Sequence, residues 1–201
     1  MKYKINEIFY SLQGEGAHTG IPAVFVRFSG CNLKCPFCDT DHSTGEMLTV
    51  SDIAAFVNAY PAEWIVLTGG EPSLFVNEDL IHFLHVATGK KIAIETNGTR
   101  RVPENIDWIT FSPKCGLDTS EEASSLALQR ADEIKVVDIG QELDFYFSLP
   151  QVNSLTKMFL QPCYVADKNE FRNNISRTVE HVKADPRWTL SAQLHRFLHI
   201  P

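Results

Sequence analysis

The sequence predicts an α/β fold: a parallel sheet whose short strands alternate with amphipathic helices, as in an incomplete, TIM-like (β/α) barrel. Six short apolar segments have the β-branched or aromatic composition of strands, and each is bounded by Gly, Pro or polar residues. Amphipathic segments separate several of them, which is typical of right-handed crossovers. The chain has 201 residues. A full eight-fold barrel typically needs roughly 250, so we expect an incomplete one.

The predicted strands are short and lie throughout the chain. In chain order they cover residues 23–28, 64–67, 91–95, 107–111, 133–137 and 157–160, and a further strand over 4–10 precedes them. The strand over 23–28 (AVFVRF) runs directly into a cysteine-containing loop. A weaker helical pattern covers residues 120–130.

Three predicted helices have recognisable start signals. Thr49 followed by Asp52 resembles a capping box, Asn77 can cap the second helix, and Asp167 with Glu170 can cap the third. Apolar residues at helical spacing predict which side chains face the core. These are Ile53, Phe56, Val57 and Tyr60 in the first helix, Leu80, Phe83, Leu84 and Ala87 in the second, and Phe171, Ile175, Val179 and Val182 in the third.

The bulk composition predicts a single domain over residues 1–201. Hydrophobic residues make up 44% and charged residues 21%, which is ordinary for a globular protein. The formal net charge of −7 argues against nonspecific nucleic-acid binding, which needs a basic face. The sequence contains neither a secretory h-region nor an apolar run long enough for a membrane span. We therefore expect a cytoplasmic protein.

Three cysteines, Cys31, Cys35 and Cys38, have the spacing C-x3-C-x2-C. In a reducing compartment, closely spaced cysteines indicate metal binding or catalysis more often than disulfides. Three thiolates on one loop can hold three irons of a 4Fe–4S cluster and leave the fourth iron open. An open coordination position distinguishes a catalytic metal site from a structural one.

A zinc site is the alternative interpretation of the same loop. Structural zinc usually takes four ligands, and Asp39, Asp41 or His42 could supply the fourth. The two remaining cysteines, Cys115 and Cys163, lie far away in the sequence, and we interpret both as small buried hydrophobic residues.

Polar or glycine-bearing segments follow five of the predicted strands. In parallel α/β sheets, ligands bind beyond the carboxyl ends of the strands, so these segments are expected to meet at one face. They are the cysteine loop, Thr68-Gly69-Gly70-Glu71-Pro72, Thr96-Asn97-Gly98, Ser112-Pro113-Lys114 and Gln161-Pro162.

Taken together, these motifs resemble a known superfamily. The cysteine spacing, with the aromatic Phe37 before the third cysteine, and the TGGEP segment resemble the signatures of radical S-adenosylmethionine (SAM) enzymes. Further features narrow the resemblance to the 7-carboxy-7-deazaguanine synthase family, over essentially the whole chain. They are the SLQGEG segment at residues 11–16, Arg27, Cys38-Asp39-Thr40, the SPK segment and the final proline.

The resemblance implies a homodimeric lyase with a 4Fe–4S cluster, SAM and magnesium. Reduction cleaves SAM to a 5′-deoxyadenosyl radical, which takes a hydrogen atom from 6-carboxy-5,6,7,8-tetrahydropterin. The pterin ring contracts with loss of ammonia to 7-carboxy-7-deazaguanine, a step toward queuosine, and SAM is regenerated. The resemblance further implies a small-molecule pathway, with flavodoxin as the expected electron donor and no membrane or nucleic-acid partner.

The resemblance also implies roles for individual residues. Cys31, Cys35 and Cys38 would hold the cluster and Thr40 the magnesium ion, for which a hydroxyl is a suitable ligand. Arg27 suits the carboxylate of the pterin, because a guanidinium can grip it through two bonds. The implied substrate contacts are Leu12, Gln13, Gly14, Arg27, Thr68 and Pro201; the implied SAM contacts are Phe37, Cys38, Asp39, Gly70, Ser112, Pro113, Lys114, Gln161, Pro162, Cys163 and Tyr164.

Simpler interpretations stay open for several of these residues. Thr40 could merely cap a turn, Arg27 could form a surface ion pair, and Gln13 could belong to a tight turn. His195 and His199 share i, i+4 spacing but are assigned no role. For the whole chain the alternatives are an activating enzyme that installs a glycyl radical on a partner protein, and a zinc or iron–sulfur binding module without SAM chemistry.

Overall fold

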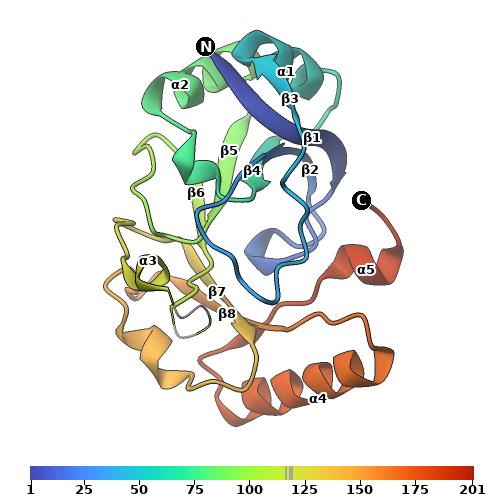
Figure 1. The fold of residues 1–201 in the computed structure, drawn as a ribbon, viewed down its shortest axis with the longest axis vertical. Coiled ribbons are helices and arrows are strands. Elements are labelled where there is room, and N and C mark those ends of the chain that lie inside the picture. Colours follow the sequence, from blue (N-terminus) through green and yellow to red (C-terminus); the bar gives the residue numbers. More distant parts are fainter. Residues whose placement is uncertain (116, 118–119) are drawn as a thin grey trace.

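The computed structural model describes residues 1–115, 117 and 120–201. Within these residues, nine strands form one sheet in the order β3-β1-β2-β4-β5-β6-β7-β8-β9 (Figure 1). The strands are β1 (Lys2–Leu12), β2 (Pro22–Phe28), β3 (Glu46–Thr49), β4 (Trp64–Gly69), β5 (Lys91–Thr96), β6 (Trp108–Phe111), β7 (Glu133–Asp138), β8 (Lys157–Pro162) and β9 (Thr189–Leu190).

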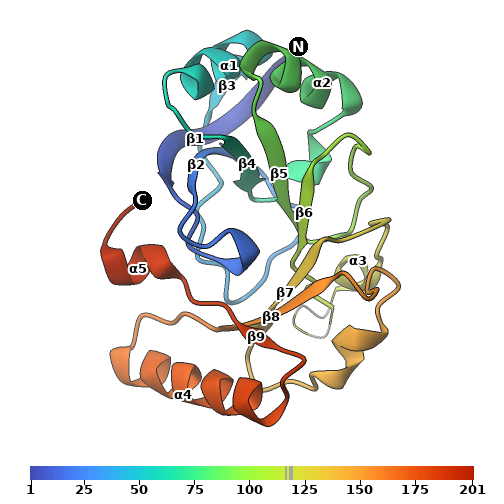
Figure 2. The same ribbon diagram turned by 180° about the vertical axis from the view of Figure 1, so that it is seen from behind.

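Helices lie at both ends of this sheet. Helices α1 and α2 pack together at one end, whereas α4 packs beside β8 and β9 at the other (Figures 1 and 2). The α-helices are α1 (Val50–Asn58), α2 (Glu78–Thr88), α3 (Glu121–Ser124), α4 (Lys168–Ala184) and α5 (Leu194–Leu198); short 3-10 turns are η1 (Gly16–His18), η2 (Pro72–Leu74) and η3 (Asp144–Ser148). No helix in the described part of the chain is long and apolar enough to cross a membrane.

The parallel sheet predicted from the sequence is confirmed from β2 to β9. Each neighbouring pair in that series runs parallel. Strand β1 differs, because it pairs antiparallel with both β2 and β3. Strand β3 is not among the predicted strands, because its four residues EMLT are too short for a distinct strand pattern.

The three predicted helix caps are confirmed. Thr49 and Asp52 form both bonds of a capping box at the start of α1. The Asn77 side chain accepts a hydrogen bond from the backbone N–H of Leu80 at 2.9 Å at the start of α2. Asp167 accepts one from the backbone N–H of Glu170 at 2.8 Å at the start of α4. Local capping therefore sets these boundaries.

The predicted inward faces of α1 and α2 are only partly correct. Phe56 and Tyr60 in and after α1, and Phe83 and Ala87 in α2, are exposed. The buried residues are instead Ile53, Ala54 and Val57 in α1 and Leu80, Ile81 and Leu84 in α2. Each helix therefore buries a narrower stripe than its apolar pattern suggests.

Two other helix predictions are wrong in part. In α4 the buried side chains are Asn174 and Thr178, because this face meets the buried carboxylate of Asp138, and the apolar residues are only half-buried. The predicted helix over 120–130, which begins after the undescribed positions 118–119, is reduced to the four residues of α3. The backbone after α3 is not helical because the N–H groups of Ala127 and Leu128 both bond to the carbonyl oxygen of Gly98.

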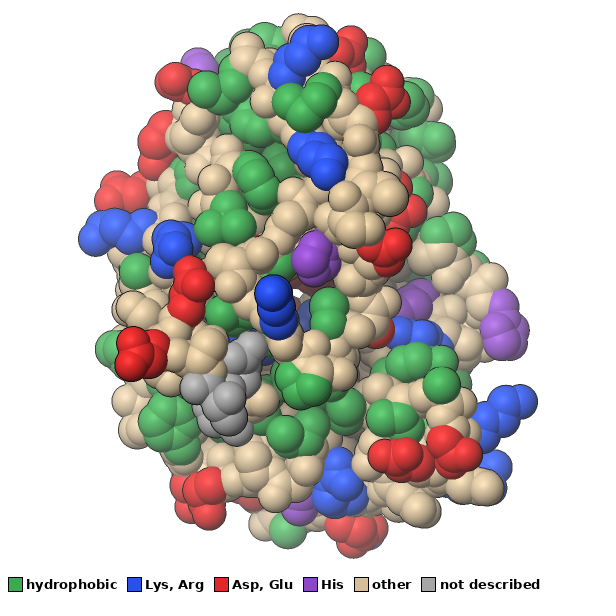
Figure 3. Space-filling view, in the orientation of Figure 1, with side chains coloured by type: hydrophobic (Ala, Val, Ile, Leu, Met, Phe, Trp, Pro, Cys, Tyr) green, Lys and Arg blue, Asp and Glu red, His purple; other side chains and the backbone are tan. Residues whose placement is uncertain are grey.

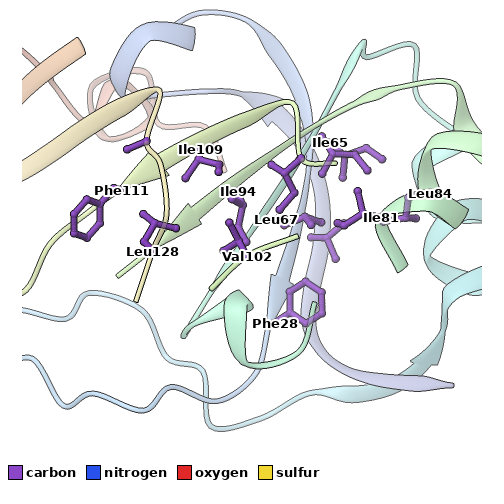
Figure 4. Close-up of a cluster of buried hydrophobic side chains, with 14 of the residues drawn as sticks. Phe28, Ile65, Leu67, Ile81, Leu84, Ile94, Val102, Ile109, Phe111 and Leu128 are labelled. Atoms are coloured by element: carbon purple, nitrogen blue, oxygen red, sulfur yellow. The ribbon is translucent and has the colours of Figure 1, made fainter. Parts of the chain in front are cut away.

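Side-chain alternation along the strands divides the sheet into two faces. Val24, Val26 and Phe28 belong to the main core beneath the helices, where they join the residues of Figure 4. Ala23 and Phe25 alternate with them on the inner face of the curved sheet, in a smaller cluster with Val66 and Ala93. The next inner-face positions along these strands carry polar side chains, and these form the site described below.

Tyr146 offers a test of the main core. It is 1% exposed, and its hydroxyl donates a hydrogen bond to the backbone carbonyl of Cys115 at 3.2 Å. Burial raises the pKa of Tyr146 to about 12. A phenol whose folded pKa lies above its unfolded value stabilises the fold fully below pH 10 and loses that contribution as the pH rises toward 12.

We expect the stability difference between the native chain and the Tyr146→Phe variant to depend on pH. Below pH 10 the native chain should be more stable by about 1 kcal/mol, the value of one hydrogen bond. Between pH 10 and 12 the native chain should lose up to about 2.7 kcal/mol relative to the variant, since each pKa unit is worth ~1.36 kcal/mol. Urea unfolding at several pH values measures this, and a constant difference would contradict it.

Candidate functional site

A cavity of about 350 Å³ lies at the carboxyl ends of the parallel strands. Side chains from the ends of β2, β4, β5, β7 and β8 line it, as the strand-end argument predicts. On the face shown in Figure 3, acidic and basic side chains are interspersed around an opening near the centre. The strand-end segments therefore surround one space.

The structure brings almost all of the predicted site residues to this cavity. The lining includes Leu12, Gln13, Gly14, Arg27, Cys31, Cys35, Phe37, Cys38, Asp39, Thr40, Thr68, Gly70, Ser112, Lys114, Gln161, Pro162, Cys163, Tyr164 and Pro201. Pro113 is the exception, because it is buried behind its neighbours and does not line the space. Leu12 and Pro201, 189 positions apart in the sequence, thus share one cavity.

The cysteine loop lies at the edge of the cavity. Cys31 and Cys35 are half-buried and Cys38 is exposed, and the Cys38 N–H bonds to the Cys35 carbonyl at 3.1 Å. Among the described residues, no three Cys, His, Asp or Glu side chains are grouped closely enough to hold a single metal ion. Three cysteine thiolates are the kind of ligand that iron–sulfur clusters take, and all three thiols border the cavity.

Gly70 of the TGGEP segment holds the base of this loop. The Gly70 N–H bonds to the Phe28 carbonyl at 3.1 Å, and the Glu71 N–H bonds to the Gly30 carbonyl at 2.9 Å, one residue before Cys31. A side chain at position 70 would collide with the Gly30 carbonyl and come within 3.0 Å of the Cys31 backbone nitrogen. Only glycine permits this close approach of the two backbones.

We expect Gly70→Ala to displace the cysteine loop. Overpacking of backbone against backbone should cost about 1–3 kcal/mol of stability, and iron bound after reconstitution should fall with it. Gly20→Ala is the control, since Gly20 has a φ of 86° with open space around it. That variant should lose about 1–2 kcal/mol from backbone strain alone. Equal iron content in both variants would contradict the prediction.

A buried charge cluster occupies the inner face of the sheet. Lys135 is 6% exposed, and its ammonium forms an ion pair with Glu15 and lies 3.6 Å from the Glu95 carboxylate. Thr68 and Gln13 donate hydrogen bonds to Glu95 at 2.9 and 3.1 Å. The cluster therefore joins the SLQGEG segment to three strands.

The cluster is electrostatically unbalanced. Burial by itself lowers the pKa of Lys135, but the carboxylates of Glu15, Glu95 and Glu133 together raise it well above its usual value. Burial tends to raise the pKa of Glu95, yet Lys135 and the hydrogen bonds from Thr68 and Gln13 lower it overall. Burial raises the pKa of Glu133. One cation thus neutralises several carboxylates at the base of the cavity.

Other polar groups stabilise the segments on which SAM contacts were predicted. Burial lowers the pKa of Lys114, whose ammonium donates to the Ser112 hydroxyl at 2.6 Å and lies 6.0 Å from the centre of the Phe37 ring. The buried Glu71 carboxylate accepts bonds from the Thr96 hydroxyl at 2.6 Å and the Asn97 N–H at 2.7 Å. The bonds to Glu71 join the segment after β4 to the end of β5 at the cavity.

Arg27 forms the ion pair that its simpler interpretation predicts, whereas Thr40 contacts the side chain of its neighbour Asp39, and both residues line the cavity. Arg27 Nε donates to the Glu7 carboxylate at 2.7 Å, across the β1–β2 pair. The Thr40 hydroxyl lies 3.4 Å from an Asp39 carboxylate oxygen. Both side chains are only half-buried and border the cavity, so either can still reach a ligand there.

Several lining residues were not predicted from the sequence. Glu95 and Lys135 are charged residues inside apolar strands, at positions that alternate with the core residues. That pattern could have indicated a buried polar site, because a lone charge in a buried strand needs a partner. Gln193, His195 and Arg196 near the end of the chain also line the cavity. Nothing in their local sequence places them beside Asp39.

A curved α/β sheet that carries a three-cysteine loop and a glycine-rich strand end around one cavity defines a radical SAM protein. The family model described as the Radical SAM superfamily matches residues 25–119. A 7-carboxy-7-deazaguanine synthase from Bacteroides thetaiotaomicron is 52% identical over 200 residues, covering 100% of both chains. The chain belongs to the 7-carboxy-7-deazaguanine synthase family.

Further relatives agree with this assignment. A 7-carboxy-7-deazaguanine synthase from Nitratidesulfovibrio vulgaris is 39% identical, again over 100% of both chains. The crystal structure of QueE from Escherichia coli superimposes with a TM-score of 0.75 and 29% identity, covering 97% of this chain and 95% of that one. The similarity therefore extends over the sheet, the cysteine loop and the segments around the cavity.

Proposed function

We propose that this cavity converts 6-carboxy-5,6,7,8-tetrahydropterin to 7-carboxy-7-deazaguanine and ammonia, as a carbon–nitrogen lyase in 7-deazapurine (queuosine) biosynthesis. The observation that carries the proposal is that the three cysteines and the SLQGEG segment line the same cavity. The product and one ammonia together contain every atom of the substrate, so the overall reaction needs no net oxidant or reductant. Family membership over the full chain supports the same reaction.

The three thiols of Cys31, Cys35 and Cys38 would hold the 4Fe–4S cluster. When bound, the cluster supplies an electron that cleaves SAM to methionine and a 5′-deoxyadenosyl radical. The chain's own contribution is placement, because the hydrogen bonds of Gly70 and Glu71 fix the start of the cysteine loop against β2 and β4. The radical and the pterin must meet within one small space, which the cavity provides.

The SAM molecule would lie against the strand ends nearest to the cysteine loop. Phe37, Cys38, Asp39 and Gly70 line the cavity and would form part of this contact. The remaining contacts would come from Ser112, Lys114 and the segment Gln161, Pro162, Cys163 and Tyr164. The Lys114 ammonium is held by Ser112 and faces the cavity, so it is suited to the carboxylate of SAM.

The pterin would bind on the opposite side, against the SLQGEG segment. Leu12, Gln13 and Gly14 offer backbone and amide groups that match the edge of an aminopyrimidine, and Thr68 borders the same region. Arg27 would bind the pterin carboxylate. Its guanidinium would either leave Glu7, with which it forms an ion pair, or contact both carboxylates at once. The backbone oxygen of Pro201 accepts a bond from Ser11 at 2.7 Å, which keeps Pro201 at this end of the cavity.

Four finer features form part of the proposal. Thr40 would bind magnesium, since its hydroxyl lies beside the cavity and magnesium prefers oxygen ligands. Flavodoxin would be the electron donor, and the enzyme would act as a homodimer in the cytoplasm. The resemblance of the motifs to the family supports all four, and the thiol-rich site agrees with a reducing compartment.

An anaerobic assay tests the function. The reconstituted protein is incubated with 6-carboxy-5,6,7,8-tetrahydropterin, SAM and dithionite, with and without magnesium. We expect 7-carboxy-7-deazaguanine in the absence of any protein partner. A reduced cluster whose spectrum does not respond to SAM would overturn the proposal in favour of a binding module. SAM cleavage that yields product only on a partner protein would favour a glycyl-radical activating enzyme.

A further inference from the structure

The segment 193–201 joins parts of the cavity that are far apart in the sequence. Helix α5 lies on the β1 side of the sheet (Figures 1 and 2). Two of its residues, His195 and Arg196, line the cavity. The Leu194 N–H bonds to the Gly14 carbonyl at 3.0 Å, within the segment proposed to bind the pterin. The Ser11 hydroxyl donates to the Pro201 backbone oxygen at 2.7 Å, in the same region.

Apolar burial does not explain the position of this helix. None of the five residues of α5 is buried, and Phe197 and Leu198 are 55% and 49% exposed. Its position therefore depends on polar contacts. Such partly exposed contacts are typically worth about 0.2–1 kcal/mol each, so the helix can shift when one of its partners is displaced.

Arg196 makes the contacts on the other side of the helix. Its guanidinium donates to the Asp39 carboxylate at 2.6 Å and lies 3.4 Å from the centre of the Tyr164 ring. Gln193 adds a second hydrogen bond to Asp39 at 3.2 Å and accepts one from Arg196 at 2.8 Å. Asp39 and Tyr164 belong to the two segments proposed to bind SAM.

We propose that Arg196 is a positioning residue that couples the binding of SAM to the binding of the pterin. It acts through Asp39 and Tyr164 on one side and through helix α5 and Gly14 on the other. SAM fixes Asp39 and Tyr164, Arg196 then holds α5 in place, and α5 fixes the Gly14 backbone. By thermodynamic linkage, the pterin must strengthen SAM binding by the same factor. The inference rests on the proposed function.

An arginine is suited to this role for a geometric reason. Its planar guanidinium can stack on the Tyr164 ring and donate to a carboxylate at the same time, whereas a lysine ammonium is a point charge. Arg196→Lys keeps a cation beside Asp39 but loses the stacked plane. Arg196→Met removes both contacts. The two variants therefore separate the ion pair from the stacking.

The test measures the dissociation constant of SAM by equilibrium dialysis on the oxidised holoenzyme, which cannot turn over, with and without saturating pterin. In the native protein we expect the pterin to lower this constant about five-fold or more, the lower range of allosteric coupling. Arg196→Met should reduce that factor to near one, and Arg196→Lys should give an intermediate value. Cluster content and thermal unfolding are measured for both variants. If Arg196→Met does not fold, the coupling factor of Arg196→Lys decides the test.

Arg187→Met is the matched control. Arg187 also pairs with carboxylates, those of Asp185 and Asp144, and its guanidinium lies 4.0 Å from the centre of the Phe147 ring, but it does not line the cavity. This variant should keep the native coupling factor. Native coupling in the Arg196 variants, or no coupling in the native protein, would overturn the inference. A native protein that couples the two ligands but forms no product would instead refute the proposed function alone.

Discussion

Replacement of Cys35 by alanine is expected to abolish the formation of 5′-deoxyadenosine. Cys35 is the middle residue of the C-x3-C-x2-C loop and borders the cavity together with Cys31 and Cys38. Without its thiol, only two of the three proposed ligands stay on the loop. Two thiolates would leave two irons of the cluster without a protein ligand and should not retain it. Both iron content and SAM cleavage should therefore fall to background.

Cys115→Ala is the control for this experiment. Cys115 is 5% exposed, belongs to the main core and does not line the cavity. Its loss should cost about 1 kcal/mol of stability, the value of a small buried group, while iron content and nucleoside yield stay at the native level. Iron is measured after anaerobic reconstitution and 5′-deoxyadenosine by chromatography. A Cys35→Ala protein with native nucleoside yield would show that the loop does not bind the catalytic cluster.

Much of the site could be predicted because its residues lie close to strand ends. The segments after β4, β6 and β8 follow recognisable apolar runs, and parallel pairing brings their ends to the same edge. Sequence pattern alone thus placed Gly70, Lys114 and Gln161 at the same edge of the sheet, where all three line the cavity. Pro113, chosen with its neighbours, is buried because adjacent residues in an extended segment point in opposite directions.

The contacts that depend on tertiary packing could not be predicted. Asp39 meets Arg196, which lies 157 residues later, because α5 returns across the cavity. Phe56 is exposed although it fits the apolar stripe of α1, since the width of the buried stripe depends on the partner surface and not on the helix. Helical periodicity indicates which residues share a face, but it does not say how much of that face is covered.

The second large effect that we expect is a loss of stability in the Lys135→Met variant, which lacks the cation of the buried charge cluster. The substitution keeps a side chain of similar length but leaves Glu15, Glu95 and Glu133 without their common cation. Removing one partner of a buried ion pair typically costs about 3–5 kcal/mol, because the remaining charge is buried and unpaired. Urea unfolding near neutral pH should show a loss of this size.

The pH dependence of that loss identifies its cause. In the native chain the pKa of Glu95 is lowered, so its contribution to stability is present above the unfolded pKa of about 4.3 and is lost as the pH falls through the folded value. Without Lys135 the carboxylates should take up protons more readily, and the deficit of the variant should shrink below roughly pH 5. Lys183→Met removes a 66% exposed lysine paired with Glu180 and should change stability by less than about 0.5 kcal/mol at any pH. A Lys135→Met deficit that stays constant on acidification would point to lost packing rather than to unpaired carboxylates.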